Sequence, residues 1–260
     1  MADCRPLAPG VCGLRAWLLG SGGWIPTAER ETACTFVRRG EDALALDAGT
    51  GLQRLVADPA LLDGVRRLDI VLTHFHLDHV CGLTYLPALP VRPTVWAPGA
   101  WLYDTPSVEL LAPLRRAPIS PFEADELGEV RELEPGPQGI GAFGIVTRAQ
   151  PRHWAPTAGL RVEDALALVT DTAFDPGSAD LARDVVHLLH EAWSTSSEPV
   201  AAEGDATAAE AGRVAREAGA RRLTLVHINP RRPDEDALLA DARRLVPEAE
   251  LGRDATELQL

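Results

Sequence analysis

One stretch of seven residues, Thr-His-Phe-His-Leu-Asp-His, holds three of the chain's seven histidines and one carboxylate. Imidazole and carboxylate groups are ligands of transition-metal ions such as zinc. The stretch follows the apolar run Ile70–Leu72, which predicts a β-strand. His74 and His76 stand two residues apart at the strand end and therefore point to the same side. Asp78 and His79 lie beyond the turn, so the spacing predicts one metal ion at the first pair and another at the second.

Short apolar runs bounded by glycine, proline or charged residues predict β-strands on both sides of this motif. The strands expected in the first half are Arg15–Leu19, Cys34–Arg38, Leu44–Asp47 and Ile70–Thr73. The strands expected in the second half are Ile145–Arg148, Leu166–Thr170, Val185–Leu189 and Leu223–Val226. Candidate ligands follow four of these strands, so we expect the chemistry to gather at one edge of the sheets.

Helical spacing of apolar residues places helices between and after these strands. The expected helices are Leu52–Val56, Leu61–Val65, Ser107–Leu114, Thr207–Ala218 and Asp234–Leu245. The proline-rich stretch Pro87–Pro121 is expected to form active-site surface, and Glu129–Gly141 a turn-rich bridge. Two series of strands, each followed by helices, favour two sheets packed face to face with helices outside. The predicted fold is an α+β protein of the αββα-sandwich type, formed by one domain over residues 1–260.

Composition narrows the classes of partner and compartment. With 25 basic and 38 acidic residues the chain has a formal net charge of −13, which disfavours binding to nucleic-acid phosphates. The chain has neither a signal-peptide pattern nor a run of about 18 apolar residues, so the sequence predicts a cytoplasmic protein without a membrane partner. The four cysteines form no CxxC pair and are expected to be reduced; they are Cys4, Cys12, Cys34 and Cys81.

The histidine motif resembles the HxHxDH signature of the metallo-β-lactamase superfamily, and the flanking sequence is most similar to its ribonuclease Z-like branch. The shared segments, in order, are Leu19-Gly20-Ser21-Gly22-Gly23, Pro26-Thr27, Arg30, Thr32 and Leu46-Asp47-Ala48-Gly49. The resemblance covers nearly the whole chain. The signature is specific for the fold and for metal binding, and it is weakly specific for the substrate.

The resemblance implies two complete ligand sets. His153, Asp171 and His227 match the family's later ligands, and a carboxylate can bridge two ions because each of its oxygens binds one. The implied set for the first ion is His74, His76, His153 and Asp171. The implied set for the second ion is Asp78, His79, Asp171 and His227. Zinc is the leading candidate for both ions, with manganese and iron as alternatives.

These ligands imply a dinuclear hydrolase in which a metal-bridging hydroxide is the nucleophile and Asp78 is a catalytic residue as well as a ligand. A phosphodiesterase acting on a small substrate is the first hypothesis, since the metals suit phosphoryl oxygens. Hydrolysis of a carboxylic ester, lactone or thioester is the alternative. A non-catalytic binding module is the weakest hypothesis, because no ligand of the two sets has been lost.

Two later segments carry a departure from the family pattern, which pairs a histidine in Gly-His-Ser-Thr with a glutamate in His-Glu-Ala-Thr. Glu191 stands in the second segment, His190-Glu191-Ala192-Trp193, but the first reads Gly204-Asp205-Ala206-Thr207. Asp205 therefore replaces the histidine that would protonate the leaving group. We consider two roles for Asp205: it shares a proton with Glu191, as paired carboxylates do, or it caps the following helix.

The excess of acidic over basic residues also bears on the class of substrate. Together with the absence of a basic, glycine- and proline-rich insertion, it argues against transfer RNA and for a small-molecule substrate. Trp154 and Trp193 lie next to the motif segments and favour a substrate with a planar or apolar part. Members of the family often dimerise, and a homodimer is therefore compatible with this chain.

Overall fold

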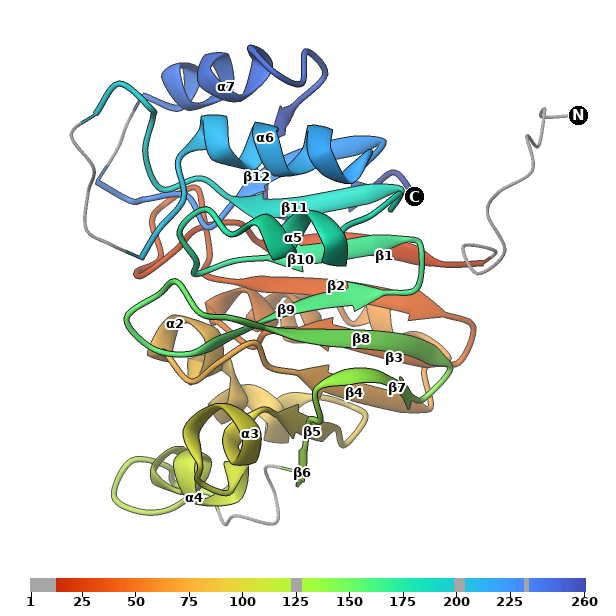
Figure 1. Ribbon diagram of the computed structural model, residues 1–260. Coiled ribbons are helices and arrows are strands. Elements are labelled where there is room, and N and C mark those ends of the chain that lie inside the picture. The colour runs from red at the N-terminus through yellow and green to blue at the C-terminus, as the bar shows by residue number, and fades with distance from the viewer. Residues whose placement is uncertain (1–12, 123–127, 199–203, 232–233) are drawn as a thin grey trace, which may run out of the picture.

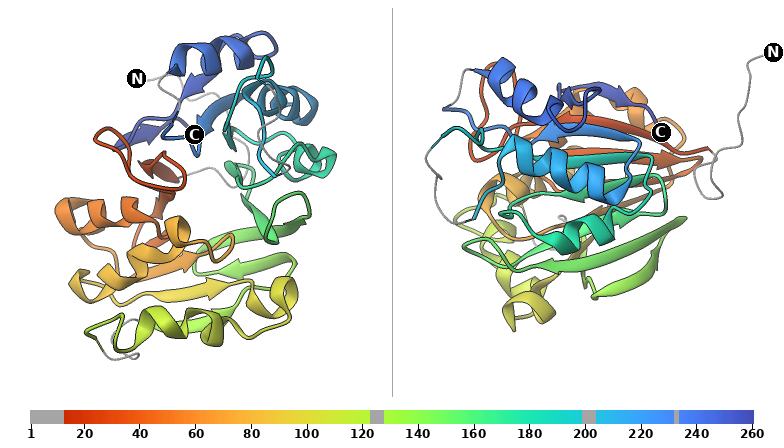
Figure 2. Two further views of the ribbon diagram at one scale, coloured as in Figure 1. Left: turned by 90° about the vertical axis from the view of Figure 1, so that its left-hand side faces the viewer. Right: turned by 45° about the horizontal axis from the view of Figure 1, so that its top comes forward.

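The computed structural model describes residues 13–122, 128–198, 204–231 and 234–260. The strands form two seven-stranded sheets that pack face to face, and helices cover both outer faces (Figure 1, Figure 2). This arrangement confirms the predicted α+β fold of the αββα-sandwich type. Within the described ranges, none of the helices combines the length and the hydropathy that a membrane crossing requires.

The first sheet has the strand order β14-β1-β2-β3-β4-β5-β6. Its strands are β1 (Arg15–Gly20), β2 (Cys34–Arg39), β3 (Asp42–Leu46), β4 (Arg67–Val71), β5 (Thr94–Ala97), β6 (Glu129–Glu132) and β14 (Thr256–Leu258). The strands from β14 to β3 pair antiparallel, and those from β3 to β6 pair parallel. The parallel half directs the carboxyl ends of β3 and β4 to one edge of the sheet.

The second sheet has the order β13-β12-β11-β10-β9-β8-β7. Its strands are β7 (Gly136–Ile140), β8 (Phe143–Gln150), β9 (Thr157–Val162), β10 (Leu166–Val169), β11 (His187–Glu191), β12 (Arg222–Val226) and β13 (Glu250–Leu251). The strands from β7 to β10 pair antiparallel, and those from β10 to β13 pair parallel. The carboxyl ends of β10, β11 and β12 therefore meet at one edge, together with the loop between β8 and β9.

Helices lie outside each sheet (Figure 2). Those of the first half are η1 (Thr50–Leu52), α1 (Gln53–Ala57), η2 (Pro59–Leu62), α2 (Leu77–Val80), η3 (Cys81–Ala88), α3 (Gly99–Tyr103), α4 (Ser107–Leu111) and η4 (Ala112–Arg115). Those of the second half are α5 (Pro176–Leu181), α6 (Ala208–Ala218) and α7 (Glu235–Arg243). The second expected helix, Leu61–Val65, is instead the 3-10 helix η2, while the other expected helices are present with shifted ends.

Three apolar clusters match the three gaps between the four layers. Strand β3 shows how the sequence fills two of them. Leu44 and Leu46 pack between the sheets, whereas Ala43 and Ala45 pack under the helices of the first half. A strand that is buried on both faces has an almost continuous apolar sequence, because its alternating side chains all enter a core. This burial explains why the expected strands appear as apolar runs.

Two segments contain more regular structure than the sequence predicts. Glu129–Gly141, expected as a turn-rich bridge, contains β6 and β7, which are edge strands of the two sheets. An edge strand tolerates Pro137 because one side of the strand needs no hydrogen-bond partner. The stretch Pro87–Pro121 contains β5 and α3 as well as the expected helix, and Val95 of β5 is fully buried. That stretch is therefore partly core rather than surface only.

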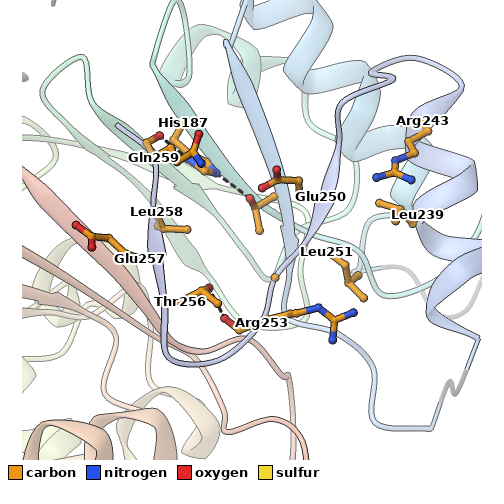
Figure 3. Close-up of a pocket in the computed structure, with 12 residues that line it drawn as sticks. His187, Leu239, Arg243, Glu250, Leu251, Arg253, Thr256, Glu257, Leu258 and Gln259 are labelled. Atoms are coloured by element: carbon orange, nitrogen blue, oxygen red, sulfur yellow. Dashed lines mark hydrogen bonds between the residues drawn. The ribbon is translucent and has the colours of Figure 1, made fainter. Parts of the chain in front are cut away.

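His187, the first residue of β11, is buried beside the C-terminal strand β14 (Figure 3). Its Nε2 lies 2.8 Å from Oγ1 of Thr224, and its Nδ1 lies 3.2 Å from the carbonyl oxygen of Gln259. These groups line a cavity of about 370 Å³. Burial lowers the pKa of His187 to about 4, although the Gln259 carbonyl opposes this shift. The imidazole is therefore neutral in the folded chain at neutral pH.

We expect the free energy of unfolding to fall as the pH is lowered from about 6.5 to about 4. In this window the unfolded chain binds a proton at His187 and the folded chain does not, so the stability present above pH 6.5 is lost towards pH 4. A pKa lowered from 6.5 to about 4 corresponds to about 3 kcal/mol. Urea unfolding of wild type and His187→Gln across this pH range measures the effect. The variant should show a shallower pH dependence, and equal slopes would contradict the assignment.

Candidate metal centre

The residues expected to bind metal lie together at one edge of the sandwich, where strands of both sheets end. The HxHxDH motif lies in the loop after β4 and in the first turn of α2. His153 lies in the loop between β8 and β9. Asp171 follows β10, and His227 follows β12. The side chains form two groups in which all ligand atoms lie within 4.8 Å of one another. The first group is His74, His76, His153 and Asp171, and the second is Asp78, His79 and His227.

Asp171 lies between the two groups and presents one oxygen to each. Its Oδ1 lies 3.7 Å from Nε2 of His74 and 3.7 Å from Nε2 of His153. Its Oδ2 lies 3.2 Å from Nε2 of His79 and 3.5 Å from Nε2 of His227. A carboxylate in this position can bind one metal ion with each oxygen.

The nitrogen atoms of the first group fit a metal ion. Nε2 of His74 and Nε2 of His153 are buried and have no hydrogen-bond partner among the described residues, which costs free energy unless another ligand is bound. Nδ1 of His153 lies 2.9 Å from the carbonyl oxygen of Gly204. Because a carbonyl oxygen can only accept, Nδ1 carries the hydrogen and Nε2 presents its lone pair.

Asp47 supports the second group, although it is not among the site residues expected from the sequence. Its Oδ2 lies 2.9 Å from Nδ1 of His79, and its Oδ1 accepts a hydrogen bond of 2.8 Å from the backbone N–H of Thr73. Asp47 is fully buried at the end of β3. The carboxylate therefore fixes the ring of His79 with Nε2 towards the centre. Its place in the shared Leu46–Gly49 segment was the signal available in the sequence.

Four residues around the centre adopt the left-handed backbone conformation that non-glycine residues rarely adopt. The φ angles are 64° at Trp24, 60° at Asp47, 53° at Asp171 and 52° at His227. Each such residue costs about 1 kcal/mol or more. The cost is concentrated where strand ends must turn side chains towards a common point.

Charges within the cluster shift its pKa values in opposite directions. Burial and the neighbouring imidazole of His79 lower the pKa of His74 well below its ordinary value. Burial also opposes protonation of His79, but Asp171 and Asp78 outweigh it and raise the pKa of His79 well above its ordinary value. Protons on the second group thus balance the carboxylates, and metal binding there competes with these protons.

Glu191 ends β11 and contacts the second group from behind. Its Oε1 accepts hydrogen bonds from the backbone N–H groups of Thr172 (2.6 Å) and Ala206 (3.2 Å). Its Oε2 lies 3.5 Å from Nδ1 of His227. Burial raises the pKa of Glu191 to about 7, although His227 opposes this shift. Glu191 therefore lies behind the His227 ring and is not among the residues that line the cavity.

Asp205 does not cap the following helix, so that alternative is wrong. The N-cap of α6 is Thr207, whose Oγ1 accepts from the backbone N–H of Glu210 in a capping box. Asp205 instead lies beside the centre, with Oδ1 3.6 Å from Nδ1 of His153. Within the part of the chain that the structure describes, its Oδ2 and Oε2 of Glu191 are both buried without a hydrogen-bond partner. Proton sharing between the two carboxylates therefore stays a prediction.

A cavity of about 590 Å³ opens above the two groups. Its lining is mostly apolar and includes Trp154 and Trp193, the two tryptophans expected near the motif segments, together with Trp24. Trp154 is 65% exposed and Trp24 is 45% exposed. Trp193 stacks on the imidazole of His227, with ring centroids 5.5 Å apart. The other lining residues are Ile25, His76, Leu77, Asp78, His153, Asp171, Asp205, His227 and Arg231.

Residues 44–228 match the family model described as the beta-lactamase superfamily domain. Ribonuclease Z of Salinibacter ruber is 28% identical, over 93% of this chain and 93% of that protein. The solved structure of the metallo-β-lactamase fold protein YhfI from Bacillus subtilis has a TM-score of 0.78 at 20% identity, covering 94% of this chain and 98% of that one. A diphosphatase from the PhnP family has a TM-score of 0.71 at 17% identity, covering 95% and 98%.

The chain belongs to the metallo-β-lactamase superfamily, a class of hydrolases that use divalent metal ions. Within the superfamily it is a member of the ribonuclease Z-like branch. The family and the enzyme class expected from the HxHxDH motif are thereby confirmed.

The prediction about the substrate is wrong. Net charge argued for a small molecule and against transfer RNA, yet the curated relatives are named ribonuclease Z. Human tRNase Z shares the fold, with a TM-score of 0.64 at 18% identity over 94% of this chain and 98% of that one. The physical reason is that net charge sums the whole surface and leaves out bound metal ions, whereas a substrate meets only the local charge of the cavity.

Asp47→Asn tests the role of the buried carboxylate behind His79. An amide is a weaker acceptor for the His79 N–H, so we expect the affinity for Zn²⁺ to fall about 10–100-fold. A chelator-competition titration measures this affinity. Asp69→Asn is the matched control, because Asp69 is an equally buried carboxylate of the first sheet that pairs with Arg67 and Trp96 instead. Equal losses in both variants would show a general effect of removing a buried charge.

Proposed function

We propose that the chain is a phosphodiesterase of the nuclease type, which hydrolyses phosphodiester bonds in RNA with two divalent metal ions, preferably zinc. The observation that carries the proposal is Asp171, whose two oxygens face two separate groups of imidazoles at the base of an open cavity. The names of the ribonuclease Z relatives support RNA as the substrate class. Bound at these two groups, divalent ions would activate water and offset negative charge on the attacked phosphate.

The proposed ligands for one ion are His74, His76, His153 and Asp171, and those for the other are Asp78, His79, Asp171 and His227. Contacts behind three of the imidazole rings hold them in place. Asp47 fixes His79, the Gly204 carbonyl fixes His153, and Glu191 lies behind His227. Such preorganised contacts remove the cost of arranging ligands during the reaction.

Asp205 is the proposed proton donor to the leaving oxygen. It lines the cavity, and its buried Oδ2 has no hydrogen-bond partner among the described residues, which favours a protonated carboxyl at this position. Protonated Asp205 would pass its proton to the departing alkoxide, leaving a carboxylate that takes up a proton again before the next turnover. A general acid in this place substitutes for the histidine of the family pattern.

The leaving group decides how much an acid is needed. Asp205→Asn should lower kcat about 100-fold for an RNA oligonucleotide, whose alkoxide must be protonated, and much less for a p-nitrophenyl phosphodiester, whose phenolate leaves unaided. Asp205→His should restore cleavage of RNA. An equal loss for both substrates would assign Asp205 a structural role, and an unchanged kcat would exclude it from catalysis.

Asp171→Ala tests the metal centre itself. Hydrolysis of an unprocessed transfer RNA transcript, a single-stranded oligoribonucleotide and bis(p-nitrophenyl) phosphate should fall by at least about 1,000-fold, since a ligand of both proposed ions is removed. Asp184→Ala is the matched control, because Asp184 has a similar left-handed φ of 57° but is exposed on another part of the chain.

The same assay separates the alternative hydrolase. The missing histidine and the largely apolar cavity would suit a carboxylic ester, lactone or thioester with a good leaving group. Metal-dependent turnover of p-nitrophenyl acetate or a simple lactone, without any phosphodiester cleavage, would replace the phosphodiesterase proposal with this one.

A further inference from the structure

A second cavity of about 560 Å³ adjoins the one above the metal centre. Trp24, Trp193 and Arg231 line both cavities, so these three side chains form their common boundary. The guanidinium carbon of Arg231 lies 4.3 Å from the centre of the Trp24 ring, in cation–π contact. The second cavity has no part in the catalytic steps described above.

The position of Trp24 is fixed relative to the metal centre. Its backbone N–H donates a hydrogen bond of 2.7 Å to Oδ2 of Asp78, one of the proposed ligands. Its φ of 64° is a left-handed conformation that costs free energy for a tryptophan. This hydrogen bond fixes the backbone of Trp24 relative to Asp78, and with it the indole and the Arg231 side chain that packs on the indole.

Arg231 places a positive group at this boundary, where the second cavity also contains the carboxylates of Glu198 and Asp234. Among the described residues that line the two cavities, Arg231 carries the one permanently positive side chain. Its guanidinium pairs with no described carboxylate and contacts the Trp24 ring. The two acidic residues of the second cavity have partners other than Arg231: Asp234 caps α7, and Glu198 accepts from the backbone N–H of Thr195 and has a further partner.

We infer that the second cavity binds the nucleoside next to the scissile phosphate, with its base against the indole rings and its own further phosphate on Arg231. The inference rests on the proposed phosphodiesterase function and deepens it. An aromatic face accepts any base, and a guanidinium forms paired hydrogen bonds with phosphate. The hydroxyls of Thr195 and Ser197 and the amide of Asn229 line the same cavity and supply hydrogen-bonding groups for the sugar and base edges.

Three substrates separate these contacts: methyl p-nitrophenyl phosphate, uridine 5′-(p-nitrophenyl phosphate), and the latter with an added 3′-phosphate. The wild type should have the highest kcat/KM for the third. Arg231→Gln should abolish the gain from the 3′-phosphate, and Trp24→Ala should lower kcat/KM about 10-fold more for both nucleoside substrates than for the methyl ester.

Arg15→Gln is the matched control. This substitution removes a comparable cation–π contact, in which the guanidinium carbon of Arg15 lies 4.6 Å from the centre of the Trp17 ring on β1. Neither residue lines either cavity. This variant should keep the wild-type preference among the three substrates. Equal losses on all three substrates in Arg231→Gln would overturn the inference.

Binding of uridine 3′,5′-bisphosphate, measured by calorimetry, tests the site without turnover. We expect about 10-fold weaker binding in Trp24→Ala and Arg231→Gln than in the wild type and in Arg15→Gln. Equal affinity in all four proteins would overturn the inference even if phosphodiesters are cleaved. Selective loss of binding without cleavage of any phosphodiester would support the subsite and overturn the proposed function instead.

Discussion

Asp171 must lie within 4 Å of four imidazoles in an interior where neither an isolated charge nor an unpartnered nitrogen is stable. This constraint accounts for much of the architecture. Asp171 and His227 follow parallel strands of the second sheet, while His74 and His79 follow a parallel strand of the first. Only two sheets packed face to face, with the parallel halves ending at the same edge, bring these residues together.

Local sequence was sufficient for the parts of the site that lie within a few residues of one another. The HxHxDH motif predicts its own geometry, because a strand end and a turn determine where its side chains point. Asp47, Trp24 and Arg231 could not be identified in this way, because their contacts join residues far apart in the chain: Asp47 meets His79 and Trp24 meets Arg231. Such pairs become visible only when the strand order and register are known.

The errors have physical causes as well. Strands β5, β6 and β7 have four or five residues each, interrupted or bordered by glycine and proline, and so give almost no periodic signal. Asp205 has a good capping side chain, but Thr207 immediately precedes α6 and has Glu210 three residues later. Net charge, a property of the whole surface, gave the wrong substrate class. The single domain over residues 1–260 stays a prediction.

The left-handed backbone at three positions of the centre restricts how this site can evolve. Aspartate, asparagine and histidine tolerate that conformation better than other residues with a side chain, and Asp47, Asp171 and His227 belong to these types. The left-handed backbone conformation and the chemistry of metal binding therefore favour the same residue types at these positions. Exchange for glutamate or cysteine, which also bind metals, would meet a backbone penalty at these positions that is absent at His74 or His153. A search for altered metal preference should therefore find its variants mainly in the HxHxDH loop and around residue 153.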